Sequence, residues 1–182
     1  MSNILGSGRP DPDFADNGLL SFNVTSGFRG HSKALPDDTS ISIGSTTPDL
    51  VADSIAILRH DAGGKPIGSV TIVQLIPDTS FVLRNLQVQA DGSVVIFGAL
   101  ESKQALFARV LPDNTLDLTF GTKGFTTFNL TDGHLLGDRH DRSGMVARTD
   151  GSIAVAVELK IGGKNNGGAL FSIDVKGTPG NK

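Results

Sequence analysis

LRNLQVQADGSVVIFGAL, which occupies residues 83–100, has the pattern of two strands joined by a tight turn. Its first part, 83–89, alternates apolar and polar side chains, as a half-buried strand does. Asp91-Gly92 is a strong hairpin signal, and we expect a type I′ turn there, with positive φ at both residues. Residues 93–100 then return as a buried strand. The stretch therefore predicts an antiparallel hairpin.

Two further strands follow this hairpin. QALFARVL (104–111) predicts a third strand, and FTTFNL (125–130) predicts a fourth. No segment between them has a helical period. The sequence thus predicts a unit of four antiparallel strands without a helix.

The unit recurs along the chain. Asp37, Asp91 and Asp150 each begin an apolar run, and they are 54 and 59 residues apart. A second pattern joins PDPDFADNGLLSFNV (10–24) to LDLTFGTKGFTTFNL (116–130): an Asp three residues before a Phe, a Gly four residues after it, then Phe-Asn-aliphatic. We call this pattern the Asp–Phe motif. Its two Phe residues, Phe14 and Phe120, are 106 residues apart, which is two periods of 53. Two independent patterns therefore give one period.

We predict an all-β chain of three four-stranded antiparallel, blade-like repeats of about 54 residues, which form a single repeat domain. Unit one is 25–76, unit two 77–130 and unit three 131–182. Unit three provides only three strands before the sequence closes on KGTPGNK. We expect an N-terminal closing strand, within residues 10–24, to supply the missing one through GLLSFNV (18–24).

Several residues of unit two resemble the delta-60 repeat family. The shared pattern is an Asp-Gly hairpin, a Val/Ile-rich strand ending in Gly, an Arg-bearing strand and Leu-Asp-x-x-Phe-Gly-x-x-Gly. The matching residues are Asp91, Gly92, Gly98, Arg109, Leu116, Asp117, Phe120, Gly121 and Gly124, with Phe14 and Gly18 in the first copy. The resemblance implies β-propeller-like blades, structural roles for these residues and no shared catalytic residues.

Propellers close with four to eight blades, and this sequence has three. We expect a homodimer in which two half-rings form a six-bladed propeller, latched by exchange of the N-terminal strand. The alternative is a closed three-fold monomer, similar to a β-trefoil or prism. A third interpretation is that the chain is a piece of a longer repeat protein.

Composition excludes several classes of partner. The net charge is −3 and no basic stripe occurs, so a nucleic-acid partner is not expected. No run of eighteen apolar residues occurs, so no membrane partner is expected, and the first residues lack a signal-peptide pattern. The cytoplasm is the default compartment. Cysteine is absent, which excludes disulfides and thiolate metal sites.

The richest polar stretch is TDGHLLGDRHDRSG (131–144), in a connection seven residues longer than its counterpart in unit one. One interpretation is a binding loop that ligates a divalent metal or clamps an anion. The other is a solvated loop whose charges pair with one another. Because no His-x-x-x-His spacing occurs, we expect no metal site, and we expect no cofactor. The candidate binding residues are His134, Asp138, Arg139, His140, Asp141 and Arg142.

Arg29 and His31 lie in the matching connection of unit one, which we interpret as a solvated turn or as part of the same binding face. Loops at 45–53, 101–104 and 160–168 should lie together on one rim. The sequence therefore favours a non-enzymatic scaffold that binds a protein or glycan partner through rim loops. The alternative is a hydrolase or lyase with a site in the central channel, assembled from one chain or across a dimer.

Overall fold

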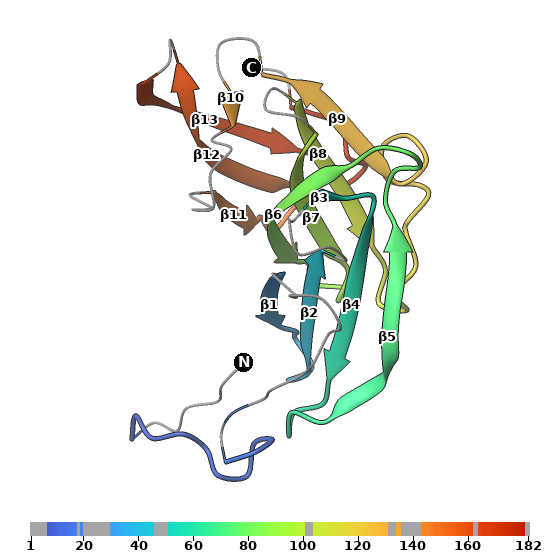
Figure 1. Cartoon of the computed structure of the whole chain (residues 1–182), viewed down its shortest axis with the longest axis vertical. Coiled ribbons are helices and arrows are strands. Elements are labelled where there is room, and N and C mark those ends of the chain that lie inside the picture. The colour runs from blue at the N-terminus through green and yellow to red at the C-terminus, as the bar shows by residue number, and fades with distance from the viewer. Residues whose placement is uncertain are drawn as a thin grey trace.

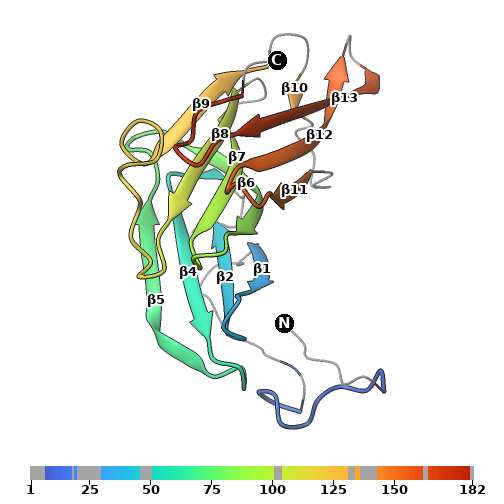
Figure 2. The same cartoon turned by 180° about the vertical axis from the view of Figure 1, so that it is seen from behind.

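The computed structural model describes residues 7–17, 19, 30–45, 51–100, 104–130, 134–135, 143–161 and 164–180. Every regular element among these residues is a β-strand, which confirms the all-β prediction. No described helix is long and apolar enough to cross a membrane. The strands form three antiparallel sheets, none of which is closed. The sheets follow one another along an arc (Figures 1 and 2).

We number the sheets after the units in which they fall. Sheet one has the order β1-β2-β4-β5, and sheet two has the order β3-β6-β7-β8-β9. In sheet three, β10 and β11 both pair with one side of β12, and β13 pairs with the other side. The bounds of sheet one are β1 Gly30–Ala34, β2 Ser40–Ser45, β4 Ser54–His60 and β5 Pro66–Gln74. Those of sheet two are β3 Val51–Ala52, β6 Phe81–Val88, β7 Val94–Leu100, β8 Gln104–Val110 and β9 Phe125–Asn129. Those of sheet three are β10 His134–Leu135, β11 Gly144–Ala147, β12 Ile153–Ile161 and β13 Lys164–Ile173.

The four predicted strands of unit two are confirmed, with ends that differ by one or two residues. The short strand β3 was not predicted. It lies in the expected loop 45–53 of unit one, yet it pairs with β6 in sheet two. A two-residue strand has no periodicity for a sequence to display, so its pairing becomes visible only in three dimensions.

The turn between β6 and β7 differs from the prediction. Gly92 has φ +80, but Asp91 is not among the residues with positive φ, so the turn is not type I′. The Gln89 N–H donates to Ser93 O at 2.8 Å, and the Gly92 N–H donates to Gln89 O at 3.0 Å. This is a three-residue loop with its left-handed position last. The Asp91 side chain fixes it by accepting from the Ser93 N–H and hydroxyl at 2.9 and 2.6 Å, which favours an Asx turn over type I′.

Sheet two is buried on both faces. Because successive residues of a strand point to opposite faces, Val94 and Ile96 of β7 pack with sheet one, whereas Val95 and Phe97 pack with sheet three. Every residue of β7 is buried as a result. Phe97 also stacks on Phe107, with ring centroids 5.1 Å apart. The core therefore consists of two apolar layers, one at each junction of sheet two with a neighbour.

The Asp–Phe motif that ends unit two docks on sheet three. The Gly121 N–H donates to Lys176 O at 2.6 Å, in the turn that follows β13. Phe120 is buried beside Gly177, where a Cβ would come within 2.9 Å of the ring. Gly177 has φ +79, so this position favours glycine for its backbone as well as for its size.

The motif near the N-terminus repeats this docking on sheet one. The Ala15 N–H donates to Gly63 O at 2.7 Å, in the turn that follows β4. Phe14 is buried beside Gly64, where a Cβ would come within 3.0 Å of the ring. Residues 7–17, drawn in blue, accordingly lie at the end of the arc opposite sheet three (Figures 1 and 2).

The two copies also share their next backbone contact. Asp16 forms a bridge with Leu19, as Thr122 does with Phe125, the first residue of β9. Leu19 of the N-terminal motif therefore corresponds to Phe125, the first residue of β9, in the motif of unit two. Of the predicted closing strand 18–24, only Leu19 lies within the described residues, so its pairing with unit three stays a prediction.

Sheet three is three strands wide in the described residues, as predicted for unit three without its closing strand. The outer edge of β13 has a single described bridge, between Ile173 and Pro179, and the Gly180 N–H donates to Ser172 O at 2.7 Å. In sheet two, the residues just before β9 make the same two contacts with β8. Leu116 bridges Val110, and the Asp117 N–H donates to Arg109 O at 2.9 Å. Gly180 thus has the place at which the Asp–Phe motif starts in unit two.

Candidate functional site

The structure places few of the predicted binding residues. His134 lies in β10, whose backbone pairs with Lys160 of β12. The other candidates from that loop, Asp138, Arg139, His140, Asp141 and Arg142, lie outside the described residues, as does Arg29. Their predicted convergence therefore stays a prediction.

His31 corrects the prediction for unit one. We expected 29–33 to form a turn, but Gly30–Ala34 is the strand β1, in which His31 pairs with Ile43. The segment GHSKA lacks an apolar alternation because it is an edge strand whose side chains are mostly exposed. Its backbone pairing with the buried strand β2 sets its conformation instead.

One pocket of 490 Å³ lies at the rim of sheet two where β6 begins and β7 ends. Among the described residues, Asp78 is the one charged residue that lines it. The rest of its lining consists of polar and apolar groups: Thr79, Ser80, Phe81, Val82, Ala99, Leu100 and Gln104.

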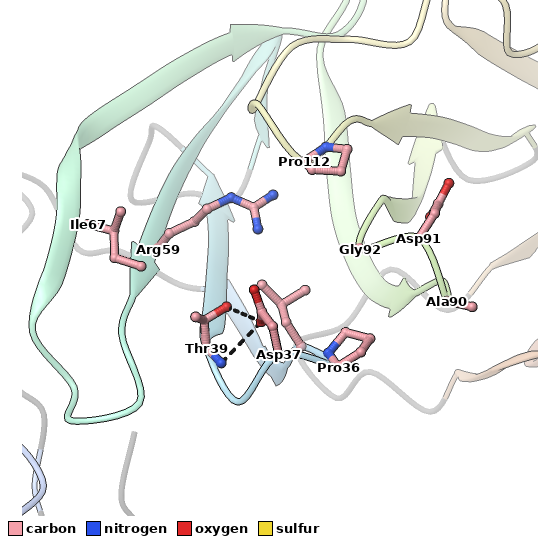
Figure 3. A pocket seen from close by; sticks show the side chains of 10 residues that line it. Pro36, Asp37, Thr39, Arg59, Ile67, Ala90, Asp91, Gly92 and Pro112 are labelled. Carbon is pink, nitrogen blue, oxygen red and sulfur yellow. Dashed lines mark hydrogen bonds between the residues drawn. The ribbon is translucent and has the colours of Figure 1, made fainter.

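A second pocket, of 330 Å³, lies on the opposite rim, between sheets one and two (Figure 3). We call it the Arg59 pocket. The turn 36–39 closes one side, and the turn 90–92 with Pro112 closes the other. Leu35, Pro36, Ile67, Ala90 and Pro112 give it apolar walls, and Asp37, Thr39, Arg59, Asp91 and Gly92 complete the lining.

Arg59 projects from β4 into this space (Figure 3). Its Nε donates to Asn114 Oδ1 at 2.6 Å. Its Nη2 is buried and has no hydrogen-bond partner within the described part of the chain. Burial lowers the pKa of Arg59, whereas the charges of Asp37 and Asp113 act to raise it. Because an arginine keeps its charge in proteins, the pocket is lined by a cationic side chain with one buried donor that has no acceptor among the described residues.

The two acidic groups of the Arg59 pocket have structural roles in their turns. Asp37 Oδ1 accepts from the Thr39 N–H at 3.2 Å and from the Thr39 hydroxyl at 2.6 Å, and these bonds lower the pKa of Asp37. Burial acts to raise the pKa of Asp91, but the hydrogen bonds from Ser93 outweigh it and the pKa is lowered. Both carboxylates are therefore held ionised, as turn formers rather than as proton donors.

The described residues provide little for catalysis. No group of three or more His, Asp or Glu side chains among them could hold a metal ion. His60 is buried in β4, and burial lowers its pKa, while neighbouring Asp61 acts to raise it. His60 does not line the Arg59 pocket.

Comparisons with known proteins add no assignment. No family model, curated protein or solved structure matches the chain. The resemblance to delta-60 repeats consequently stays a prediction that rests on the residues of unit two.

Our prediction from the sequence missed Arg59, although a signal for it was present. The residue eight positions after Arg109 is Asp117, whereas the residue eight positions after Arg59 is Ile67. The junction of sheets one and two therefore has the arginine, but an isoleucine stands where the junction of sheets two and three has its aspartate.

Proposed function

We propose that the protein is a non-enzymatic interaction module that assembles with a second copy into a six-bladed ring. Each copy would contribute three blades. The N-terminal strand of each copy would complete sheet three of the other, and the rims of the ring would bind a protein or glycan partner.

The docking of Phe14 on sheet one is the observation that supports this proposal. In unit two, the motif that docks Phe120 on sheet three continues directly into β9, the fourth strand of that unit and an edge strand of sheet two. By the same connection, residues 18–24 would form the fourth strand of a sheet that precedes sheet one. Sheet three lacks such a strand in the described residues, and Gly180 lies at its outer edge in the position where the motif begins in unit two. Sheet three of a second copy therefore fits this place.

Exposed apolar side chains at both ends of the arc support the same proposal. On sheet three, Leu170 and Val146 are 71% and 56% exposed and lie on the face that points away from sheet two. On sheet one, Ile72 and Val70 of β5 are 59% and 43% exposed. Exposed apolar surface of this kind marks interfaces in soluble proteins. A ring would bury both ends against each other.

Light scattering after size exclusion tests the assembly. The proposal expects a mass of 37.8 kDa at micromolar concentration, twice the 18.9 kDa of one chain. The double substitution Leu20→Pro and Phe22→Pro should shift the mass to one chain, because proline cannot donate to a strand ladder. The variant Asn3→Pro adds proline outside the segment and should stay dimeric. A wild-type mass of 18.9 kDa at all concentrations would contradict the proposal.

A further inference from the structure

Arg59 and Arg109 have equivalent places in adjacent sheets. Arg59 lies one residue before His60, which pairs with Ser40, the third residue after Asp37. Arg109 lies one residue before Val110, which pairs with Val94, the third residue after Asp91. Each arginine also reaches a turn of the next sheet: Arg59 reaches Asn114, in the turn after β8, and Arg109 reaches Val175, in the turn after β13. The two side chains can therefore be compared atom by atom.

Arg109 is fully partnered. Its Nε donates to Asp117 Oδ2 at 2.6 Å, and its Nη2 is 2.5 Å from the same oxygen. Its Nη1 donates to Val175 O at 2.8 Å, and its guanidinium carbon lies 5.1 Å from the ring centroid of Phe120. The Asp–Phe motif thus supplies both a carboxylate and an aromatic face to this arginine.

Unit one lacks that motif beside Arg59. Ile67 pairs with Arg59 where Asp117 bonds to Arg109, so an aliphatic side chain replaces the carboxylate. The two units come back into register at Ile72 and Thr127, which pair with Ala56 and Leu106. From 67 to 72 is five positions and from 117 to 127 is ten, so unit one is five residues shorter here. Arg59 Nη2 consequently keeps no acceptor among the described residues.

The space that the aromatic ring would need is already filled. Asn114 has the place of Gly177, and its side chain accepts from Arg59 and donates to Thr71 Oγ1 at 3.4 Å. What the junction of sheets one and two lacks is therefore the carboxylate alone. Its place opens on the Arg59 pocket, since both Arg59 and Ile67 line that pocket.

The acidic residues in the two neighbouring turns do not prevent a carboxylate from lying beside the arginine. Asp37 and Asp91 flank Arg59 in the pocket, and the equivalent turns at the next junction carry Asp91 and Asp150. Between those turns burial acts to raise the pKa of Asp117, yet hydrogen bonds from Thr119 and Arg109 lower it. The same arrangement at the next junction thus accommodates a carboxylate, which forms an ion pair with Arg109.

We infer that the Arg59 pocket binds an acidic peptide segment of a protein partner, with a carboxylate on Arg59 and aliphatic neighbours on the pocket walls. The inference deepens the proposed function, because it assigns one rim site and its class of ligand. The internal precedent is Leu116-Asp117-Leu118, in which aliphatic residues flank the carboxylate. The volume of 330 Å³ is within the range of pockets that hold small ligands, and Leu35, Pro36, Ile67 and Pro112 offer apolar surface to such neighbours.

The test uses the full chain and the peptide acetyl-Leu-Asp-Leu-amide, with binding followed by chemical shifts of the Arg59 guanidinium and by calorimetry. Acetyl-Leu-Asn-Leu-amide should bind about tenfold more weakly or worse, since a charged hydrogen bond is lost. Arg59→Gln should weaken the Asp peptide by a similar factor. Ile67→Asp should abolish binding while the fold is retained, because the new carboxylate would occupy Arg59 in cis. Glucose and N-acetylglucosamine, as neutral hydroxylated probes, should not shift the Arg59 signals.

Equal binding of the Asp and Asn peptides, unchanged binding by Arg59→Gln, or tighter binding of the sugars would each overturn the inference. The mass of the protein in the same sample, measured by light scattering, tests the dimer separately from the peptide binding. Peptide binding by a monomeric chain would refute the strand exchange and leave the pocket inference standing.

Discussion

The junctions on the two sides of sheet two are constructed alike but completed differently. At the junction with sheet three, Arg109, Asp117 and Phe120 form a closed cluster in which each polar group has a partner. At the junction with sheet one, Arg59 meets Asn114 instead, and one donor stays without an acceptor in the described residues. Two repeats can thus share their strands while a segment five residues shorter leaves a pocket where the other repeat has a structural contact.

The same comparison extends to the ends of the arc. Phe14 docks on sheet one as Phe120 docks on sheet three, and the second of these contacts joins sheet two to sheet three. Sheets one and two lack this link, and Asn114 takes over part of its role. The motif is therefore a connector, and its position indicates where a neighbouring sheet is expected.

The largest expected effect comes from removing the connector ring. Phe120→Ala should lower the free energy of unfolding by about 3–5 kcal/mol, because Phe120 is 1% exposed and packs between sheets two and three. Chemical denaturation measures this. Leu118→Ala is the matched control, since Leu118 lies in the same motif but is 69% exposed, and it should change stability by less than about 0.5 kcal/mol. Equal effects of the two substitutions would show that the motif does not dock as described.

Removing the charge of Asp117 tests the polar half of the connector. Asp117→Asn keeps an acceptor for the Thr119 N–H but loses the ion pair with Arg109, which should cost about 1.5–3 kcal/mol. Asp150→Asn, at an exposed turn with the same backbone bond, should have a much smaller effect in the same denaturation experiment. If the Asp117 variant were as stable as the wild type, the closed cluster would not stabilise this junction.

The pH dependence of stability distinguishes sheet one from sheet two, because His60 in sheet one has the position of Val110 in sheet two. Burial lowers the pKa of His60 in the folded state, so the unfolded chain binds more protons near pH 6. Stability should therefore be highest above about pH 6.5 and should fall as the pH drops through the folded pKa. His60→Val should flatten this part of the stability profile. The fall below about pH 3.8 should persist in the variant, because the lowered carboxylate pKa values of Asp37 and Asp117 cause it.

The smallest expected effect is an increase in the free energy of unfolding. Ile67→Asp should place a carboxylate beside Arg59 and recreate the pair of Arg109 and Asp117, which should stabilise the chain by about 0.5–1 kcal/mol. Ile67 is 48% exposed, so little apolar burial is lost. Ile67→Asn is the control without charge. The expected difference between the two variants should shrink at high salt, and no difference at low salt would mean that residue 67 does not face the guanidinium.

The strands were predictable because their apolar alternation is local and repeated, as in 83–100. The docking of Phe14 was not predicted, because it depends on a left-handed glycine in a turn about fifty residues away, which no local pattern reveals. The Arg59 pocket also escaped prediction, since it lies where unit one is five residues shorter than unit two. His31 was misplaced for a related reason: an exposed edge strand is specified by its partner strand rather than by its own residues.

Cross-linking tests the exchanged strand most directly. If residues 19–23 pair with β13 as β9 pairs with β8, Leu20 of one copy lies opposite Leu170 of another. The chain has no cysteine, so Leu20→Cys with Leu170→Cys should form an intermolecular disulfide under mild oxidation. Val146, on the same face but separated from β13 by β12, is the control position for the second cysteine. The account predicts covalent dimers for the first pair and few for the control; cross-links within one chain, or equal yields for both pairs, would contradict it.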